Sequence, residues 1–307
     1  MNQKSTRILT LAVLLLVFGA MQAFGQTIYD STVNPLPGNL ASTGAQADAW
    51  SQIGDGVTFA GAARNLKTVT VTLSSWGCQS GAWYSNDCAT TPGATFNIDV
   101  TFNLYSAGSP LPGAAIATRT QTFAVPYRPS VDPSCGGGRW REASTGICYN
   151  GLANNITFDF SSQNVVLPNS AVYGLSYNTT SYGPNPVGTG AACFLTPAGC
   201  PYDSLNVALA PVVTVGSKQF PDTIYWNDFY ASNYCDGGLA GSGFFRLDSP
   251  TVACWAGYIP AAKFTATFPV ATSANACKNN GWQTLSRANG STFKNQGDCI
   301  QYVNTGK

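Results

Sequence analysis

The stretch that decides the fold is FNIDVTFNL, residues 96–104, in which apolar and polar side chains alternate without a break. A period of two residues is typical of a β-strand with one buried face and one wet face. The same alternation recurs in VTVTL (69–73) and in ITFDF (156–160). No segment has a convincing helical period, so the chain is predicted to be all-β.

Further alternating segments lie at residues 173–177, 205–209 and 264–268, and a run that ends with Phe123 and Val125 stops at Pro126. Many half-buried strands joined by long loops favour an antiparallel β-sandwich, which we expect to be jelly-roll-like. Residues 26–270 are predicted to form this domain. Its loops are longer than hairpin turns, and ordered loops of that length often carry function.

Residues 1–25 have the three parts of a secretory signal peptide. Lys4 and Arg7 make a basic start, residues 8–18 are apolar, and Ala23 and Gly25 are the small residues expected before cleavage at Gln26. No later segment is long and apolar enough to span a bilayer. We therefore expect the protein to be secreted or held at the cell surface, with no transmembrane segment once the leader is removed.

The amino-acid composition limits the kinds of catalytic and metal-binding site that the chain can form. The chain contains no histidine, so it lacks the commonest general base and the commonest metal ligand. Charged residues make up 9% of the chain, and without the leader 13 basic residues face 14 acidic ones. Because no basic stripe is present, nucleic acid is not an expected partner.

Ten cysteines follow a spacing of short and long gaps, which favours disulfides between sequence neighbours. The predicted pairs are Cys78–Cys88, Cys135–Cys148, Cys193–Cys200, Cys235–Cys254 and Cys277–Cys299. Zinc is the rival interpretation, but it requires closely spaced cysteine pairs and an intracellular setting. The pairing of the last four cysteines stays open, because Cys254 is about as far from Cys277 as Cys277 is from Cys299.

Residues 271–307 are predicted to be a linker followed by a small C-terminal tail. The stretch from Ala271 to Ala276 is rich in Thr, Ser, Ala and Asn, and the Cys277–Cys299 bridge would close the unit around Trp282 and Phe293. So small a unit needs such a bridge, because it cannot bury enough apolar surface alone.

Several stretches resemble a family of uncharacterised secreted bacterial β-proteins. They are SQIGDGVTFAG (51–61), RNL (64–66), SSWGC (74–78), TFAVPYRPS (122–130), YGLSYNT (173–179) and YDSLNV (202–207). A second resemblance lies in ACKNNGW (276–282) and FKNQGDC (293–299), which are similar to a CKxGGW…FKNQGxC module at the ends of exported bacterial proteins. These resemblances imply an extracellular setting and no particular chemistry.

Aromatic residues lie in or beside the cysteine-bounded loops, where exposed rings would suit stacking on sugars. The candidate ligand-facing residues are Trp83, Tyr84, Trp140 and Trp226. The alternative is that these rings fill the space beneath long loops. In that case they are structural.

Paired carboxylates would permit glycoside hydrolysis without histidine. The candidates are Glu142, Asp203, Asp222, Asp228 and Asp236. Calcium is a possible bound metal, because secreted sandwiches can bind it through loop oxygens. Its candidate ligands are Asp55, Asp132, Asp203, Asp228 and Asp236, although no DxDxDG-type run is present.

These observations predict a non-catalytic secreted or cell-surface protein with a structural, adhesive or ligand-binding role. A glycan or another surface protein is the expected partner. An extracellular carbohydrate-active enzyme that uses two carboxylates is the alternative. Neither catalytic nor cofactor-binding residues are assigned.

Overall fold

The computed structural model describes residues 25–44, 50–83, 86–108, 112–177, 205–219, 225–228, 246–247 and 257–307. Residues 1–24 of the predicted signal peptide and the cysteines of the third and fourth predicted pairs lie outside these ranges. The chain divides into two compact units, of which one is Thr27–Ala266 and the other contains Thr267–Lys307.

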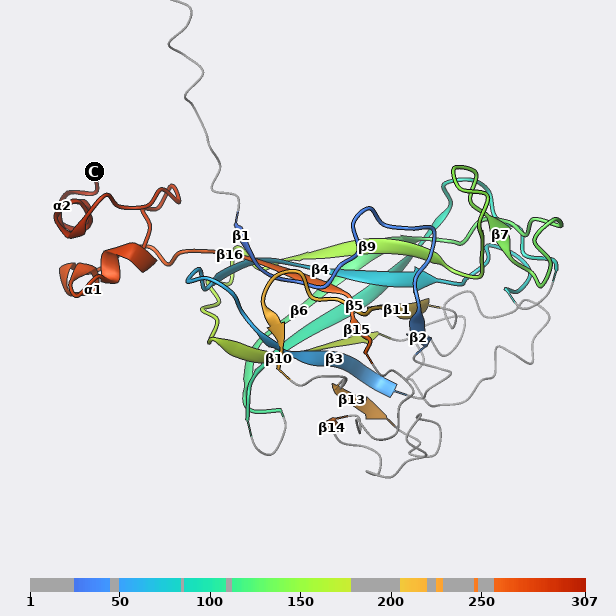
Figure 1. Cartoon of the computed structure of the whole chain (residues 1–307), viewed down its shortest axis with the longest axis horizontal. Coiled ribbons are helices and arrows are strands. Elements are labelled where there is room, and N and C mark those ends of the chain that lie inside the picture. Colours follow the sequence, from blue (N-terminus) through green and yellow to red (C-terminus); the bar gives the residue numbers. More distant parts are fainter. Residues whose placement is uncertain are drawn as a thin grey trace, which may run out of the picture. The chain divides into compact units, whose positions relative to one another are not determined.

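The first unit contains two seven-stranded sheets (Figure 1). In the first sheet the strand order is β1-β16-β4-β11-β15, with β2 paired to β11 and β9 paired to β4. Its strands are β1 (Gln26–Asp30), β2 (Ser42–Gly44), β4 (Asn65–Ser75), β9 (Leu152–Asp159), β11 (Leu205–Ala210), β15 (Ile259–Pro260) and β16 (Ala262–Thr267).

In the second sheet the order is β14-β13-β3-β10-β5-β6, with β12 paired to β3. Its strands are β3 (Trp50–Thr58), β5 (Thr95–Ser106), β6 (Ala115–Pro126), β10 (Ser170–Tyr177), β12 (Ser217–Lys218), β13 (Tyr225–Asp228) and β14 (Arg246–Leu247). A separate two-stranded ribbon consists of β7 (Trp140–Arg141) and β8 (Cys148–Tyr149). Every strand pair whose register is given is antiparallel, so the predicted all-β, antiparallel class is confirmed.

The apolar residues of the alternating segments form the core between the two sheets. Phe102 of β5 packs against Phe158 of β9, with ring centroids 5.5 Å apart, and against Phe264 of β16 at 5.8 Å. Phe102 and Phe158 are fully buried, whereas Asp99 on the opposite face of β5 is exposed. The sandwich therefore arises from the period-two pattern, while the jelly-roll connectivity stays a prediction.

Glutamine side chains join the two sheets where the edge strands β6 and β9 approach each other. Gln121 of β6 donates from Nε2 to the carbonyl of Thr157 at 3.5 Å. Gln163, which follows β9, donates from Nε2 to the carbonyl of Thr118 at 3.3 Å. Each amide thus covers a backbone acceptor that the edge strand would otherwise offer to another strand.

The C-terminal tail is helical, which the sequence pattern did not predict. It contains α1 (Ala274–Cys277), the 3-10 helix η3 (Gly281–Thr284) and α2 (Gln296–Thr305). Asn295 caps α2 by accepting from the amide of Asp298 at 2.9 Å, and Gly306 ends it in the left-handed conformation. Capping side chains at the start and a glycine just past the end are the usual local signals of a helix.

The core of the tail forms around the predicted bridge. Cys277 and Cys299 are joined and fully buried, and Phe293 is buried beside them. Trp282 packs against this cluster as a partly buried residue, together with Leu285, Ile300, Tyr302 and Val303. Ala271, placed in the predicted linker, is itself part of this core and donates its amide to the carbonyl of Ser286 at 2.9 Å.

Candidate functional site

Two long connections meet at one end of the sandwich and form what we call the loop cluster, residues 76–90 and 127–151. The strand labelled β7 marks this end in Figure 1. Backbone hydrogen bonds join the two connections: Arg128 donates to the carbonyl of Gly77, and Val131 donates to that of Cys88, each at 3.0 Å. These contacts hold two segments about 50 residues apart in the sequence as one surface.

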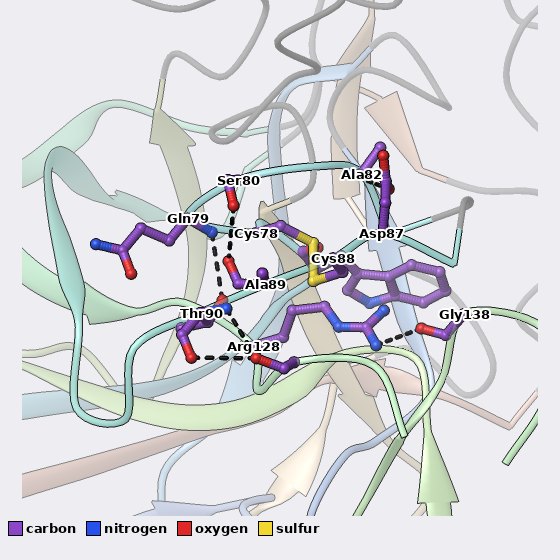
Figure 2. Close-up of a disulfide and its surroundings, with 12 residues drawn as sticks. Cys78, Gln79, Ser80, Ala82, Asp87, Cys88, Ala89, Thr90, Arg128 and Gly138 are labelled. Atoms are coloured by element: carbon purple, nitrogen blue, oxygen red, sulfur yellow. Dashed lines mark hydrogen bonds between the residues drawn. A yellow bond between two sulfur atoms is a disulfide. The ribbon is translucent and has the colours of Figure 1, made fainter. Parts of the chain in front are cut away.

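Each connection is closed by a predicted disulfide. Cys78 pairs with Cys88, and Cys135 pairs with Cys148. Within the first loop, Ser80 and Ala89 exchange backbone hydrogen bonds of 3.0 and 2.9 Å, so the bridge closes a miniature hairpin (Figure 2). With Cys277–Cys299 in the tail, three of the five predicted pairs are confirmed, and the other two lie outside the described residues.

Arg128 is a fully buried cation beneath the loop cluster. Its guanidinium donates to the carbonyls of Gly138 and Pro129, and Figure 2 shows the bond to Gly138 beside the Cys78–Cys88 bridge. Its Nη1 meets no hydrogen-bond partner among the described residues. Burial lowers the pKa of Arg128 to about 10, because the charged form loses its hydration. This arginine acts as an internal brace for the loops.

Trp140 does not face a ligand, which corrects one sequence-based candidate. Only 5% of its surface is exposed, and its indole nitrogen donates to the carbonyl of Gly151 at 2.7 Å. Its ring packs against Tyr149, which lies opposite it in the β7–β8 ribbon. Indole is buried in proteins when its N–H finds a partner of this kind, so Trp140 fills the space under the loop.

Trp76 and Trp83 form the aromatic pair that reaches the surface of the loop cluster. Their rings meet edge to face with centroids 4.8 Å apart, and both residues are half-buried. The indole nitrogen of Trp76 donates to the hydroxyl of Ser74 at 2.9 Å, which fixes this ring. The candidate Tyr84 lies outside the described residues, as does the side chain of Trp226 on β13.

The candidate acids of the enzyme hypothesis are not brought together in the described residues. Glu142 is the one whose side chain is described, and its carboxylate accepts from the hydroxyl of Thr145 at 2.6 Å. This contact closes the turn before β8. The side chains of Asp203, Asp222, Asp228 and Asp236 lie outside the described residues.

Two of the calcium candidates, Asp132 and Asp55, lie in the described residues, and they belong to different parts of the fold. Asp132 accepts from the amide of Ser134 at 2.8 Å and pairs with Arg141 at 3.3 Å. The hydrogen bonds from Ser134, and then the charge of Arg141, hold the pKa of Asp132 below its usual range. Asp55 lies on β3 in the sandwich. Within the described part of the chain, no three His, Cys, Asp or Glu residues gather as a metal site would require.

Asp55 is a fully buried carboxyl, a feature that sequence reasoning did not identify. One oxygen accepts from the amide of Gly56 at 2.7 Å, and Oδ2 meets no partner among the described residues. Burial raises the pKa of Asp55 well above its usual range, against the smaller opposing effects of the Gly56 bond and the charge of Lys218. The sequence carried a signal for this burial, because Asp55 lies two residues from both Ile53 and Val57 and so shares their buried face of β3.

Comparisons of the chain with protein-family models, curated proteins and solved structures each gave no match. The family resemblance drawn from the sequence therefore stays a prediction. In the described residues, no helix is both long enough and apolar enough to cross a membrane.

Proposed function

We propose that the chain is a secreted or cell-surface, non-catalytic protein that binds a glycan or another surface protein through its loop cluster. The observation that carries this proposal is the half-buried Trp76–Trp83 pair, which lies at the loop that the Cys78–Cys88 disulfide closes. A rigid aromatic surface binds at a low cost in conformational entropy, because few torsions are lost on contact.

The contacts that the charged side chains of the loop cluster make support a binding role over a catalytic one. In the loop cluster Glu142 closes a turn, Asp132 pairs with Arg141, and Arg128 braces the backbone. A catalytic carboxylate pair needs two acids facing a shared substrate position, and these groups are instead held in contacts within their own loops.

The disulfides support an oxidising setting outside the cytosol. Disulfide bonds persist in such a compartment. The loops that these disulfides close are rich in Gly, Ser and Asn. Such loops would otherwise be exposed to proteolysis. The predicted leader would direct the chain to that compartment.

A glycan array probed with the mature protein and with Trp83→Ala tests the proposal. We expect wild-type binding to one class of glycan, and at least a tenfold loss for the variant, since truncation of an aromatic anchor costs on the order of 2 kcal/mol. Tyr258→Ala is the matched control, because Tyr258 is an exposed aromatic outside the loop cluster. Equal binding by Trp83→Ala and wild type would contradict the role of the pair. Release of reducing sugar from a bound glycan would favour the enzyme alternative.

A further inference from the structure

The charges of the chain are divided unevenly between its two units. Residues 26–266 contain 9 Lys and Arg against 13 Asp and Glu, whereas residues 267–307 contain four basic residues and a single acid, Asp298. The net side-chain charge of residues 267–307 is therefore +3, whereas that of residues 26–266 is −4. Such asymmetry is typical of a segment that contacts a polyanion.

The single acid of the tail already has a cationic partner. Asp298 pairs with Arg287 at 2.6 Å and accepts from the amide of Lys294 at 2.9 Å. These hydrogen bonds hold the pKa of Asp298 below its usual range, so the carboxylate stays charged. Arg287 is in turn held over the ring of Phe293 at 4.6 Å, against the core of the tail. This pair belongs to the interior contacts of the tail and leaves the lysines to set its surface charge.

The three lysines of the tail are exposed, and the charge of Lys294 contributes to the low pKa of Asp298. Lys278 donates to the neutral side-chain oxygen of Asn275 at 3.0 Å, and Lys294 and Lys307 are exposed without an ion pair in the described tail. The Cys277–Cys299 bridge ties Lys278, directly after α1, to the first turn of α2, which Lys294 precedes. The bridge therefore holds the segments that carry Lys278 and Lys294, while Lys307 follows the cap of α2 at Gly306.

We propose that the tail is a surface-retention module that binds an anionic, carboxylate-bearing polysaccharide through Lys278, Lys294 and Lys307. Ammonium groups are hydrated point charges that suit a repeating polyanion without demanding one geometry. The choice of a polysaccharide over nucleic acid or lipid rests on the proposed function, which places the protein outside the cell. The acidic sandwich would be repelled by the same polymer, so retention would depend on the tail.

Retention of the full mature chain on immobilised polygalacturonate tests this proposal, with dextran as the neutral matrix. We expect retention that falls with salt because of screening. Lys278→Gln/Lys294→Gln should weaken binding about 5-fold for each lysine removed, by analogy with lysines at anionic surfaces. The matched control is Lys67→Gln/Lys263→Gln, which removes the same charge from the sandwich and should bind as wild type does.

Equal loss in both variants would overturn the proposal, since net charge alone would then govern retention. Binding to phosphatidylglycerol vesicles without binding to polygalacturonate would overturn the choice of partner. The Trp83→Ala variant separates the two ideas. If Trp83→Ala loses glycan binding but keeps its retention on polygalacturonate, the tail acts as a separate binding module. If the lysine variant is retained as well as wild type, the proposal for the tail is refuted, while the proposed function of the loop cluster is unaffected.

Discussion

The phenolic hydroxyl of Tyr173 on β10 donates a hydrogen bond of 2.9 Å to the main-chain carbonyl of Pro260 on β15 and so joins the two sheets. Tyr173 is fully buried, and its ring stacks on Phe102 with an interplanar angle of 9°. A second bond of this kind joins Tyr177 of β10 to the carbonyl of Leu205 on β11 at 3.1 Å. The geometry of the Tyr173 bond requires the two sheets to keep one relative position at this point.

Tyr173→Phe should lower the free energy of unfolding by about 1 kcal/mol. The cost stays at the lower end because the Pro260 carbonyl also accepts from the hydroxyl of Ser31 at 3.3 Å. Urea denaturation of the mature protein measures it. Tyr258→Phe, at an exposed position, should change stability by less than about 0.5 kcal/mol. A larger effect at Tyr258 than at Tyr173 would refute this account of the interface.

Asp55 should make the sandwich less stable as the pH rises above about 4, the pKa of an unfolded aspartate. Its folded pKa is raised by burial, so the folded state holds a proton that the unfolded state releases. The contribution is therefore complete below the unfolded pKa and is lost as the pH rises toward the folded one, by at most about 1.4 kcal/mol per pH unit. The groups around it are Tyr29, Tyr173 and Lys218, and the two tyrosines are neutral in this range.

Asp55→Asn should remove this slope, because the amide carries no charge at any pH. Urea denaturation between pH 4 and pH 8 compares the two proteins. Asp99→Asn is the control, since Asp99 is exposed on β5. If wild type and Asp55→Asn show the same pH dependence, the buried carboxyl is not the group that titrates.

Arg128→Met should loosen the loop cluster while leaving the sheets folded. The methionine fills much of the same volume but leaves the carbonyls of Gly138 and Pro129 without their donor, at a cost of about 1–3 kcal/mol. Limited proteolysis followed by mass spectrometry should then show faster cleavage within residues 76–90 and 127–151. Arg139→Met, at an exposed position in the same loops, should be cleaved as slowly as wild type.

Cys277→Ser/Cys299→Ser should unfold the tail and spare the sandwich. The bridge closes a ring with a sequence separation of 22 residues, for which the loop-entropy estimate is about 3 kcal/mol. A core as small as that around Phe293 cannot supply this stabilisation in another way. Circular dichroism should show loss of the α2 signal with the strand signal retained. Collapse of both signals together would show that the two units depend on one another.

The sequence predicted the parts of the fold that follow a local period. Val100, Phe102 and Leu104 are fully buried in β5, as their alternation with polar residues requires. Helix α2 was not predicted because it is only 10 residues long. Its core residues Cys299, Ile300, Tyr302 and Val303 therefore cover too short a stretch to establish a helical period. The capping residues Asn295 and Gly306 marked its two ends, and they are the signal that periodicity missed.

The burial of side chains in the loops could not be predicted from a local period. Trp140 lies in a connection with no period, and its burial depends on contacts with Gly151 and Tyr149. At Asp55 two local signals disagree. Its position in the strand pattern predicts a buried side chain, whereas its charge predicts an exposed one. Local pattern prevailed there because the strand fixes which way each side chain points.

The three described bridges have one further consequence, which concerns how the chain acquires them. Their partners are separated by 10, 13 and 22 residues, and no bridge encloses a cysteine of another. Short separations give each thiol a high effective concentration of its own partner. Each native pair should therefore form as soon as its segment meets an oxidant, in any order, with little need for an isomerase to undo mistaken pairings.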